Sequence, residues 1–334
     1  MLTELSRYLD ENRSELGLPE VNRVELCFFK AGGNPWNEGR INFLVFNGGE
    51  KDPLLFIKVM REERYDSLDR EYRIMEMMAA HNEIAPFLPL PIKHVAISGH
   101  SAIIQGACHG TRLLTLMGTH RTLFFQKEGI EKAFHHALTF AAPFNKVMKH
   151  HIGTEEFRKT ATGPIASFYE TFEESNPKNE KLSSILEEVE KEMGESPVVV
   201  PAHGDYSATN IFVNPDNRIT VIDWETAIEE SLPFLDLFYF MSKYIHNLKV
   251  RPKDRWRRVR EAYFGNNWFS GLIRETVEEY CIKTGFDRNL GRSLFPLHFL
   301  VKARIKFNMR GREPAKAWID LFEYSANNND KLCF

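Results

Sequence analysis

Three polar residues lie at spacings that suit the activation of a hydroxyl group beside a metal-bound phosphate. In the segment that begins His203-Gly204, Asp205 is followed five residues later by Asn210, and Asp223 comes thirteen residues after that. One carboxylate in such a set can orient an attacking hydroxyl and take its proton, while the amide and the second carboxylate hold Mg²⁺ on nucleotide phosphates. The spacing therefore predicts metal-assisted phosphoryl transfer, with Asp205 as the catalytic residue and Asn210 and Asp223 as metal ligands.

A polar turn between two strands is the simpler alternative for this segment. Glycine, aspartate and asparagine all favour turns, but a turn does not require this spacing. At average residue frequencies, the pattern His-Gly-Asp-x4-Asn should occur by chance on the order of once in a thousand chains of this length. Asp223 also follows an apolar strand pattern, Ile219 to Ile222. We therefore favour the chemical interpretation over the turn.

Two stretches, HGDYSATN at 203–210 and VIDWETA at 221–227, resemble the signatures of the aminoglycoside phosphotransferase and choline kinase family. These enzymes are small-molecule relatives of protein kinases. The resemblance is strongest over 201–240 and extends over 23–110. It implies an α+β, protein-kinase-like fold of two lobes, ATP or GTP with Mg²⁺, and a small acceptor bearing a hydroxyl. It also implies that Asp236 braces the catalytic loop and that His203 orients its backbone.

The periodicity of apolar residues divides the chain into a β-rich and a helical part. Strands are predicted at 24–30, 40–46, 54–60, 94–97 and 101–106, with a helix at 66–80. Helical patterns dominate 121–149, 155–174, 179–193 and 234–328. We expect a small β-rich N-lobe over 1–105 and a larger, mainly helical C-lobe over 106–334, with a linker near 106–111.

Other residues of the N-lobe are candidates for binding the nucleotide. Lys58 lies in the apolar strand LLFIKVM, where an unpartnered lysine would be costly to bury. It could hold the α- and β-phosphates, with Glu71 as its ion-pair partner; the alternative is a solvent-facing lysine on an edge strand. Gly33, in a Gly- and Asn-rich loop, could bring backbone N–H groups to phosphate, although a plain hairpin loop is nearly as good an explanation. The backbone around Gln105 is expected to meet the adenine.

Composition limits the class of protein. The chain has 334 residues, 43% of them hydrophobic, and a formal net charge of −3, so no overall field favours nucleic acid or a membrane surface. The N-terminal segment has charges throughout, unlike a signal peptide, and no apolar run approaches the length of a membrane span. Four widely separated cysteines favour a reducing compartment, so we expect a cytoplasmic protein. The oligomeric state cannot be deduced.

Two other functions remain open from the sequence. One is a protein kinase, which Ser207 disfavours because serine/threonine protein kinases have a lysine at that position. The other is a nucleotide-binding module that acts through partners, which the complete set of Asp205, Asn210 and Asp223 disfavours. Acceptor choice is assigned to the helical segments 121–195 and 240–330, which are rich in aromatic residues and arginine. The basic run 251–260 is interpreted as a solvated helix face, with an anionic partner as the alternative.

Overall fold

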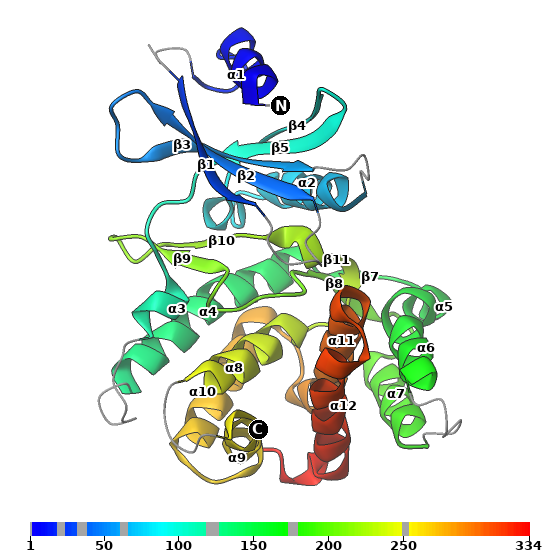
Figure 1. Ribbon diagram of the computed structural model, residues 1–334. Coiled ribbons are helices and arrows are strands. Elements are labelled where there is room, and N and C mark those ends of the chain that lie inside the picture. Colours follow the sequence, from blue (N-terminus) through cyan, green and yellow to red (C-terminus); the bar gives the residue numbers. More distant parts are fainter. Residues whose placement is uncertain are drawn as a thin grey trace. The chain divides into compact units, whose positions relative to one another are not determined.

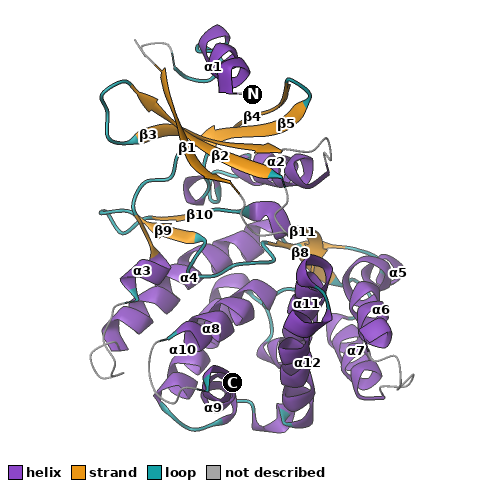
Figure 2. Ribbon diagram, viewed as in Figure 1, coloured by secondary structure: helices purple, strands orange, loops and turns teal. Residues whose placement is uncertain are grey.

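The computed structural model describes residues 2–18, 24–31, 39–60, 66–117, 127–172, 180–248 and 254–334. Its chain forms two compact units, which Figures 1 and 2 show with their elements. The sheet unit comprises Met1–Thr111 and Phe212–Glu225. The helical unit comprises Arg112–Ile211 and Thr226–Phe334.

The sheet unit is built on five antiparallel strands in the order β1-β2-β3-β5-β4. These are β1 (Val24–Ala31), β2 (Arg40–Asn47), β3 (Pro53–Met60), β5 (His100–Gly106) and β4 (Pro91–Ile97). In β3, Lys58 lies opposite Asn42 of β2 and Ile103 of β5. Because β3 is the central strand and Lys58 is only 6% exposed, the edge-strand alternative for this lysine is wrong.

The two faces of this sheet have different partners. Strand residues alternate between faces, so Ile57 and Val59 point away from Lys58. Both join the buried apolar cluster that includes Leu5 and Leu9 of α1 (Leu2–Glu11). Helix α2 (Asp66–Ala79) packs against β4 and β5. A short 3₁₀ turn, η1 (Ala85–Phe87), leads from this region toward β4.

A later part of the chain returns to the sheet unit. Strands β9 (Ile211–Val213) and β10 (Ile219–Val221) are neighbours in a small sheet, and β10 contacts η1. Asp223 lies two residues after the end of β10 and directly precedes the 3₁₀ turn η4 (Trp224–Thr226). The small sheet thus places Asp223 in the sheet unit, although it is far from β3 in sequence.

Long helices dominate the helical unit. Its elements are α3 (Leu113–Leu116), α4 (Lys127–Met148), α5 (Thr154–Phe157), a π-helical turn (Arg158–Thr162), α6 (Gly163–Phe172), α7 (Glu180–Met193), α8 (Leu235–Asn247), α9 (Arg255–Phe264), α10 (Trp268–Thr284), α11 (Arg288–Arg310) and α12 (Arg312–Asn327). Helix α8 packs against α4, α9 and α11, and α12 packs along α11. The helical core is therefore centred on α8 and α11.

In the helical unit, a small sheet adjoins the segment 203–210, which contains the predicted catalytic Asp205 and is called the catalytic segment below. Its strands lie in the order β11 (Ile228–Ser231), β8 (Val198–Ala202) and β7 (His150–His151). The segment 203–210 follows β8. Short β6 (Thr111–Arg112) lies where the first unit ends.

The expected α+β, kinase-like architecture is confirmed. All five strands and the helix predicted in the first third are present, within a few residues of their expected bounds. The division of the chain into an N-lobe over 1–105 and a C-lobe over 106–334 stays a prediction. No helix in the described parts of the chain is long and apolar enough to cross a membrane.

Candidate active site

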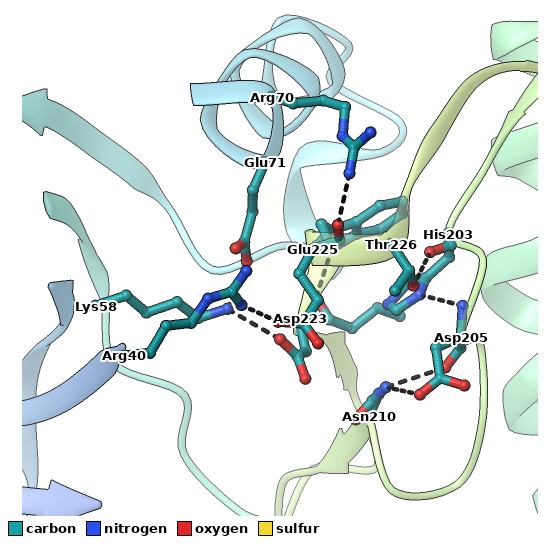
Figure 3. A network of polar contacts seen from close by, with 12 residues as sticks. Arg40, Lys58, Arg70, Glu71, His203, Asp205, Asn210, Asp223, Glu225 and Thr226 are labelled. Atoms are coloured by element: carbon teal, nitrogen blue, oxygen red, sulfur yellow. Dashed lines mark hydrogen bonds and ion pairs between the residues drawn. The ribbon is translucent and has the colours of Figure 1, made fainter. Parts of the chain in front are cut away.

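In the sheet unit, one buried lysine joins two carboxylates. Lys58 Nζ donates to Glu71 Oε1 at 2.6 Å and to Asp223 Oδ1 at 3.0 Å (Figure 3). Burial alone would lower the pKa of Lys58, but the carboxylates of Asp223 and Glu71 outweigh it and raise that pKa. The ammonium is therefore held charged, and the cluster of one cation and two anions carries a net negative charge.

Glu71 reaches Lys58 from the buried face of α2. Leu68, Glu71, Met75 and Met78 recur at helical spacing, and all four are buried. Among the described residues, Glu71 Oε2 has no hydrogen-bond partner. Such a buried group is held in place by its ion pair, and loss of either partner from a buried pair is strongly destabilising, by about 3–5 kcal/mol.

Asp223 adopts an unusual backbone conformation. Its φ of 70° lies in the left-handed region, which aspartate tolerates better than most residues. The next residues are anchored to the sheet unit: Arg40 forms an ion pair with Glu225, and Arg70 Nη2 donates to the Glu225 carbonyl at 3.1 Å. Strained backbone that is fixed in this way is commonly found at functional sites.

In the helical unit, Asp236 shapes the catalytic segment. Its carboxylate accepts hydrogen bonds from the backbone N–H of His203 at 2.6 Å and of Gly204 at 3.1 Å. Thr226 Oγ1 donates to the His203 carbonyl at 3.2 Å. Burial raises the pKa of Asp236, against the opposing effect of His203 and the two N–H donors. The bracing expected of Asp236 is thus present.

Asp205 is bonded mainly through one of its two oxygens. Its Oδ1 accepts from the Tyr239 hydroxyl at 2.7 Å and from Lys302 Nζ at 3.1 Å. Burial would raise the pKa of Asp205, but Lys302, Lys306 and the Tyr239 hydrogen bond lower it well below its usual range. Among the described residues, its Oδ2 has only a long contact, 3.5 Å, with Asn210 Nδ2. The lowered pKa favours the ionised carboxylate, whose Oδ2 can accept a hydrogen bond from a hydroxyl.

Lys302 is a site residue that our sequence analysis missed. It lies in α11, is 2% exposed, donates to the Gly204 carbonyl, and has its Nζ 3.6 Å from the centroid of the Tyr239 ring. Burial lowers the pKa of Lys302 to about 8, although Asp205 opposes this shift. The signal was available, because Lys302 interrupts the apolar run HFLVKARI as Lys58 interrupts LLFIKVM. A lysine in a predicted helix does not by itself indicate a buried cation, because helices usually have a solvated face.

Asn210 is oriented by the loop that it closes. Its Nδ2 donates to the Asp205 carbonyl at 3.0 Å, and no hydrogen bond engages its Oδ1 within the described residues. An amide oxygen here and the Asp223 carboxylate are hard oxygen donors of the type that Mg²⁺ takes. Among the described residues, no group of three or more His, Cys, Asp or Glu could hold a metal ion. Each of these two oxygen donors, taken by itself, is of a kind that suits a magnesium ion, which takes few protein ligands and is completed by phosphate and water.

The remaining nucleotide candidates are less well defined. Gly33 lies outside the described residues. Gln105 lies in β5, is 3% exposed, and its Oε1 has no hydrogen-bond partner among the described residues. Next to it, the N–H of Gly106 donates to Leu90 O at 2.9 Å, and that of Ala107 donates to Leu54 O at 3.0 Å. An adenine contact from this segment would therefore have to use other backbone groups.

The predicted residues thus fall into two clusters. Lys58, Glu71 and Asp223 come together in the sheet unit, and Asp205 and Asn210 come together in the helical unit. Tyr239 of α8 also belongs to the second cluster, since it donates its hydroxyl to Asp205.

The solved structures to which this chain is similar include kinases and phosphotransferases. A glucosamine kinase in complex with glucosamine, ADP and inorganic phosphate has a TM-score of 0.51 at 13% identity, covering 95% of this chain and 84% of that chain. An aminoglycoside phosphotransferase from Streptomyces rimosus has a TM-score of 0.46 at 14% identity, over 89% of this chain and 98% of that chain. A macrolide 2′-phosphotransferase from Brachybacterium faecium has a TM-score of 0.44 at 16% identity, over 95% and 98%.

The likeness to glucosamine kinase confirms the kinase-like fold that the two sequence motifs implied. No protein-family model matches the sequence. No curated protein matches it either.

Proposed function

We propose that this protein transfers the γ-phosphoryl group of ATP or GTP to a hydroxyl of a small molecule, of the amino-sugar, sugar or amino-alcohol class. The observation that carries the proposal is the buried Lys58 bonded to both Glu71 and Asp223. A lysine in this setting is costly to maintain without a task. The net negative charge of the cluster suits a divalent cation, and its ammonium suits a phosphate.

Each residue of the sheet unit then has a role in binding the nucleotide. Lys58 binds the α- and β-phosphates, and Glu71 fixes the direction of the ammonium. Asp223, together with Asn210 of the catalytic segment, holds Mg²⁺. When bound, the ion neutralises negative charge on the phosphates.

The residues of the helical unit act on the acceptor. Asp205 Oδ2 accepts a hydrogen bond from the acceptor's hydroxyl and so orients it. The same oxygen takes the proton of the hydroxyl as transfer proceeds. A carboxylate with so low a pKa is a weak base, but a weak base suffices because phosphoryl transfer has a loose transition state in which positioning matters most. Lys302 supplies positive charge next to Asp205. In serine/threonine protein kinases, a lysine at the position of Ser207 supplies this charge.

The glucosamine kinase of the same fold was solved with glucosamine and ADP, which supports a nucleotide and a sugar-like acceptor as the first compounds to test. We place the activity in the cytoplasm, where ATP and small hydroxyl compounds are abundant and where scattered cysteines stay reduced.

A transfer assay tests this proposal. The protein is incubated with γ-³²P-labelled ATP, Mg²⁺ and a small-molecule extract freed of protein, and in parallel with a protein extract. We expect ³²P in small molecules that stay in solution after inorganic phosphate has been removed by precipitation. Label in protein would favour the protein kinase alternative. Nucleotide binding without transfer to either pool would refute the enzymatic role and favour a binding module.

A further inference from the structure

A row of cations begins at the proposed catalytic carboxylate. Lys302, Lys306 and Arg310 recur every four residues along α11, so they lie on one side of the helix about 6 Å apart in rise. Lys302 is bonded to Asp205, and the charge of Lys306 also lowers the pKa of Asp205. The row therefore extends from the bonded carboxylate toward the C-terminal end of α11.

Helix α8 adds a cation to the same region. Lys243 comes one helical turn after Tyr239, whose hydroxyl bonds Asp205, and α8 packs against α11. Arg255, the first residue of α9, also lies within electrostatic reach of Lys243. Helices α8, α9 and α11 thus each contribute a cation that acts on Asp205 or on Lys243.

These charges repel one another. Lys243 is half-buried, and burial together with the charges of Lys306, Arg255 and Arg310 lowers its pKa. Asp205 is an anion that raises the pKa of Lys243, but its Oδ1 is already bonded to Lys302. The local excess is therefore positive.

No ion pair among the described residues offsets this excess. Within the described residues, Lys243, Lys306, Arg255 and Arg310 form no ion pair and no hydrogen bond through their side chains. Arg257, two positions after Arg255, shows the contrast, since it pairs with Glu261 at 2.7 Å. Cations gathered without partners destabilise a fold, and regions of one charge sign at a site attract a ligand of the opposite sign.

We infer that the acceptor carries an anionic group, a phosphate or a carboxylate, which Lys243 and Lys306 bind while its hydroxyl meets Asp205 Oδ2. This inference rests on the proposed phosphotransferase function and narrows its acceptor class. Arg255 and Arg310 are both exposed, and their charges add to the electrostatic attraction of the anionic group. One helical turn separates Lys306 from Lys302, so the anionic group and the reacting hydroxyl should be about 6 Å apart. A cationic amino-sugar would be repelled by the same residues.

The first test separates acceptors by charge. A small-molecule extract is divided by ion exchange into anionic, neutral and cationic pools, and each is incubated with the protein and γ-³²P-labelled ATP. We expect transfer only in the anionic pool. Transfer in the neutral or cationic pool overturns this inference but leaves the proposed function standing. Absence of transfer in every pool overturns the proposed function and this inference together.

The second test identifies the residues. With the anionic pool as acceptor, Lys306→Gln and Lys243→Met should each raise the acceptor concentration needed for half-maximal rate at least tenfold, while the KM for ATP changes less than twofold. Lys132→Gln, which removes an exposed lysine of α4, is the matched control and should change neither value.

Thermal melting provides a readout independent of activity. Because no ion pair within the described residues holds either side chain, neither variant should melt appreciably below the wild type. Unchanged acceptor dependence in both variants would overturn the inference. A rise in the KM for ATP instead would also overturn it, since it would show that these cations bind the nucleotide. If one variant fails to fold, the other decides.

Discussion

At the scale of single residues, two buried lysines define the candidate site. Lys58 and Lys302 each interrupt an apolar run, and each is bonded to a carboxylate: Lys58 to Glu71 and Asp223, and Lys302 to Asp205. Burying an ammonium without a partner costs several kcal/mol in free energy, so in both cases the fold supplies an anion. A lysine inside an apolar run is therefore a candidate for a buried, ion-paired residue in a helix as well as in a strand.

Substitution of Asp223 tests the metal-binding role. We expect Asp223→Ala to weaken Mg·ATP binding at least about tenfold, or roughly 1.4 kcal/mol, because it removes a charged ligand. Calorimetric titration with and without Mg²⁺ measures this change. Asp216→Ala, in the exposed turn of the same segment, is the control. Unchanged affinity and an unchanged metal requirement would show that Asp223 is not a ligand.

The pH dependence of the rate tests Lys302. Because burial lowers the pKa of Lys302 to about 8, this side chain loses its charge as pH rises through that value. We expect kcat/KM to fall above about pH 8 in the wild type. Lys302→Met should be slow at every pH and should lack this descending limb. A limb near pH 8 that persists in Lys302→Met would assign it to another group.

At the scale of elements, the catalytic segment depends on one glycine. Gly204 has a φ of +75°, and a Cβ built there would overlap the carbonyl oxygen of Thr226. Its N–H and carbonyl are both bonded, to Asp236 and to Lys302. No other residue type satisfies the backbone conformation and the close approach together.

We therefore expect Gly204→Ala to destabilise the protein by more than the 1–2 kcal/mol or so that left-handed backbone alone costs. Gly194→Ala is a closely matched control, since Gly194 has a φ of +69° with nothing within 4 Å of its added Cβ. Denaturant unfolding of both variants measures the difference. Equal losses of stability in the two would show that the contact with Thr226 is unimportant.

The elements themselves were largely predictable. Alternation of apolar residues located β2, a nearly continuous apolar run located β3, and the 3.6-residue period located α2. The segment 155–174 was expected to be mostly helical, and its described part consists of α5, a π-helical turn and α6. A π turn inserts one residue without altering composition, so apolar periodicity does not reveal it.

At the scale of the whole molecule, the site depends on contacts between distant parts of the sequence. The motif around Asp205 identified the residues that lie close together along the chain. It could not identify Lys302, which is 97 residues away, because the packing of α11 against the catalytic segment is not encoded in any local pattern. Local spacing thus pointed to the residues of the motif, while the electrostatic setting of Asp205 required the fold.

The two units imply a separation of tasks, with Lys58 and Asp223 in one and Asp205 in the other. The most direct test of the central claim is to measure, for Asp205→Asn and wild type side by side, acceptor-dependent ADP formation and the affinity for Mg·ATP. We predict that transfer falls by about 10²–10⁴ in kcat while the affinity for Mg·ATP stays within a few-fold of wild type. Transfer at a rate near that of the wild type would contradict the account.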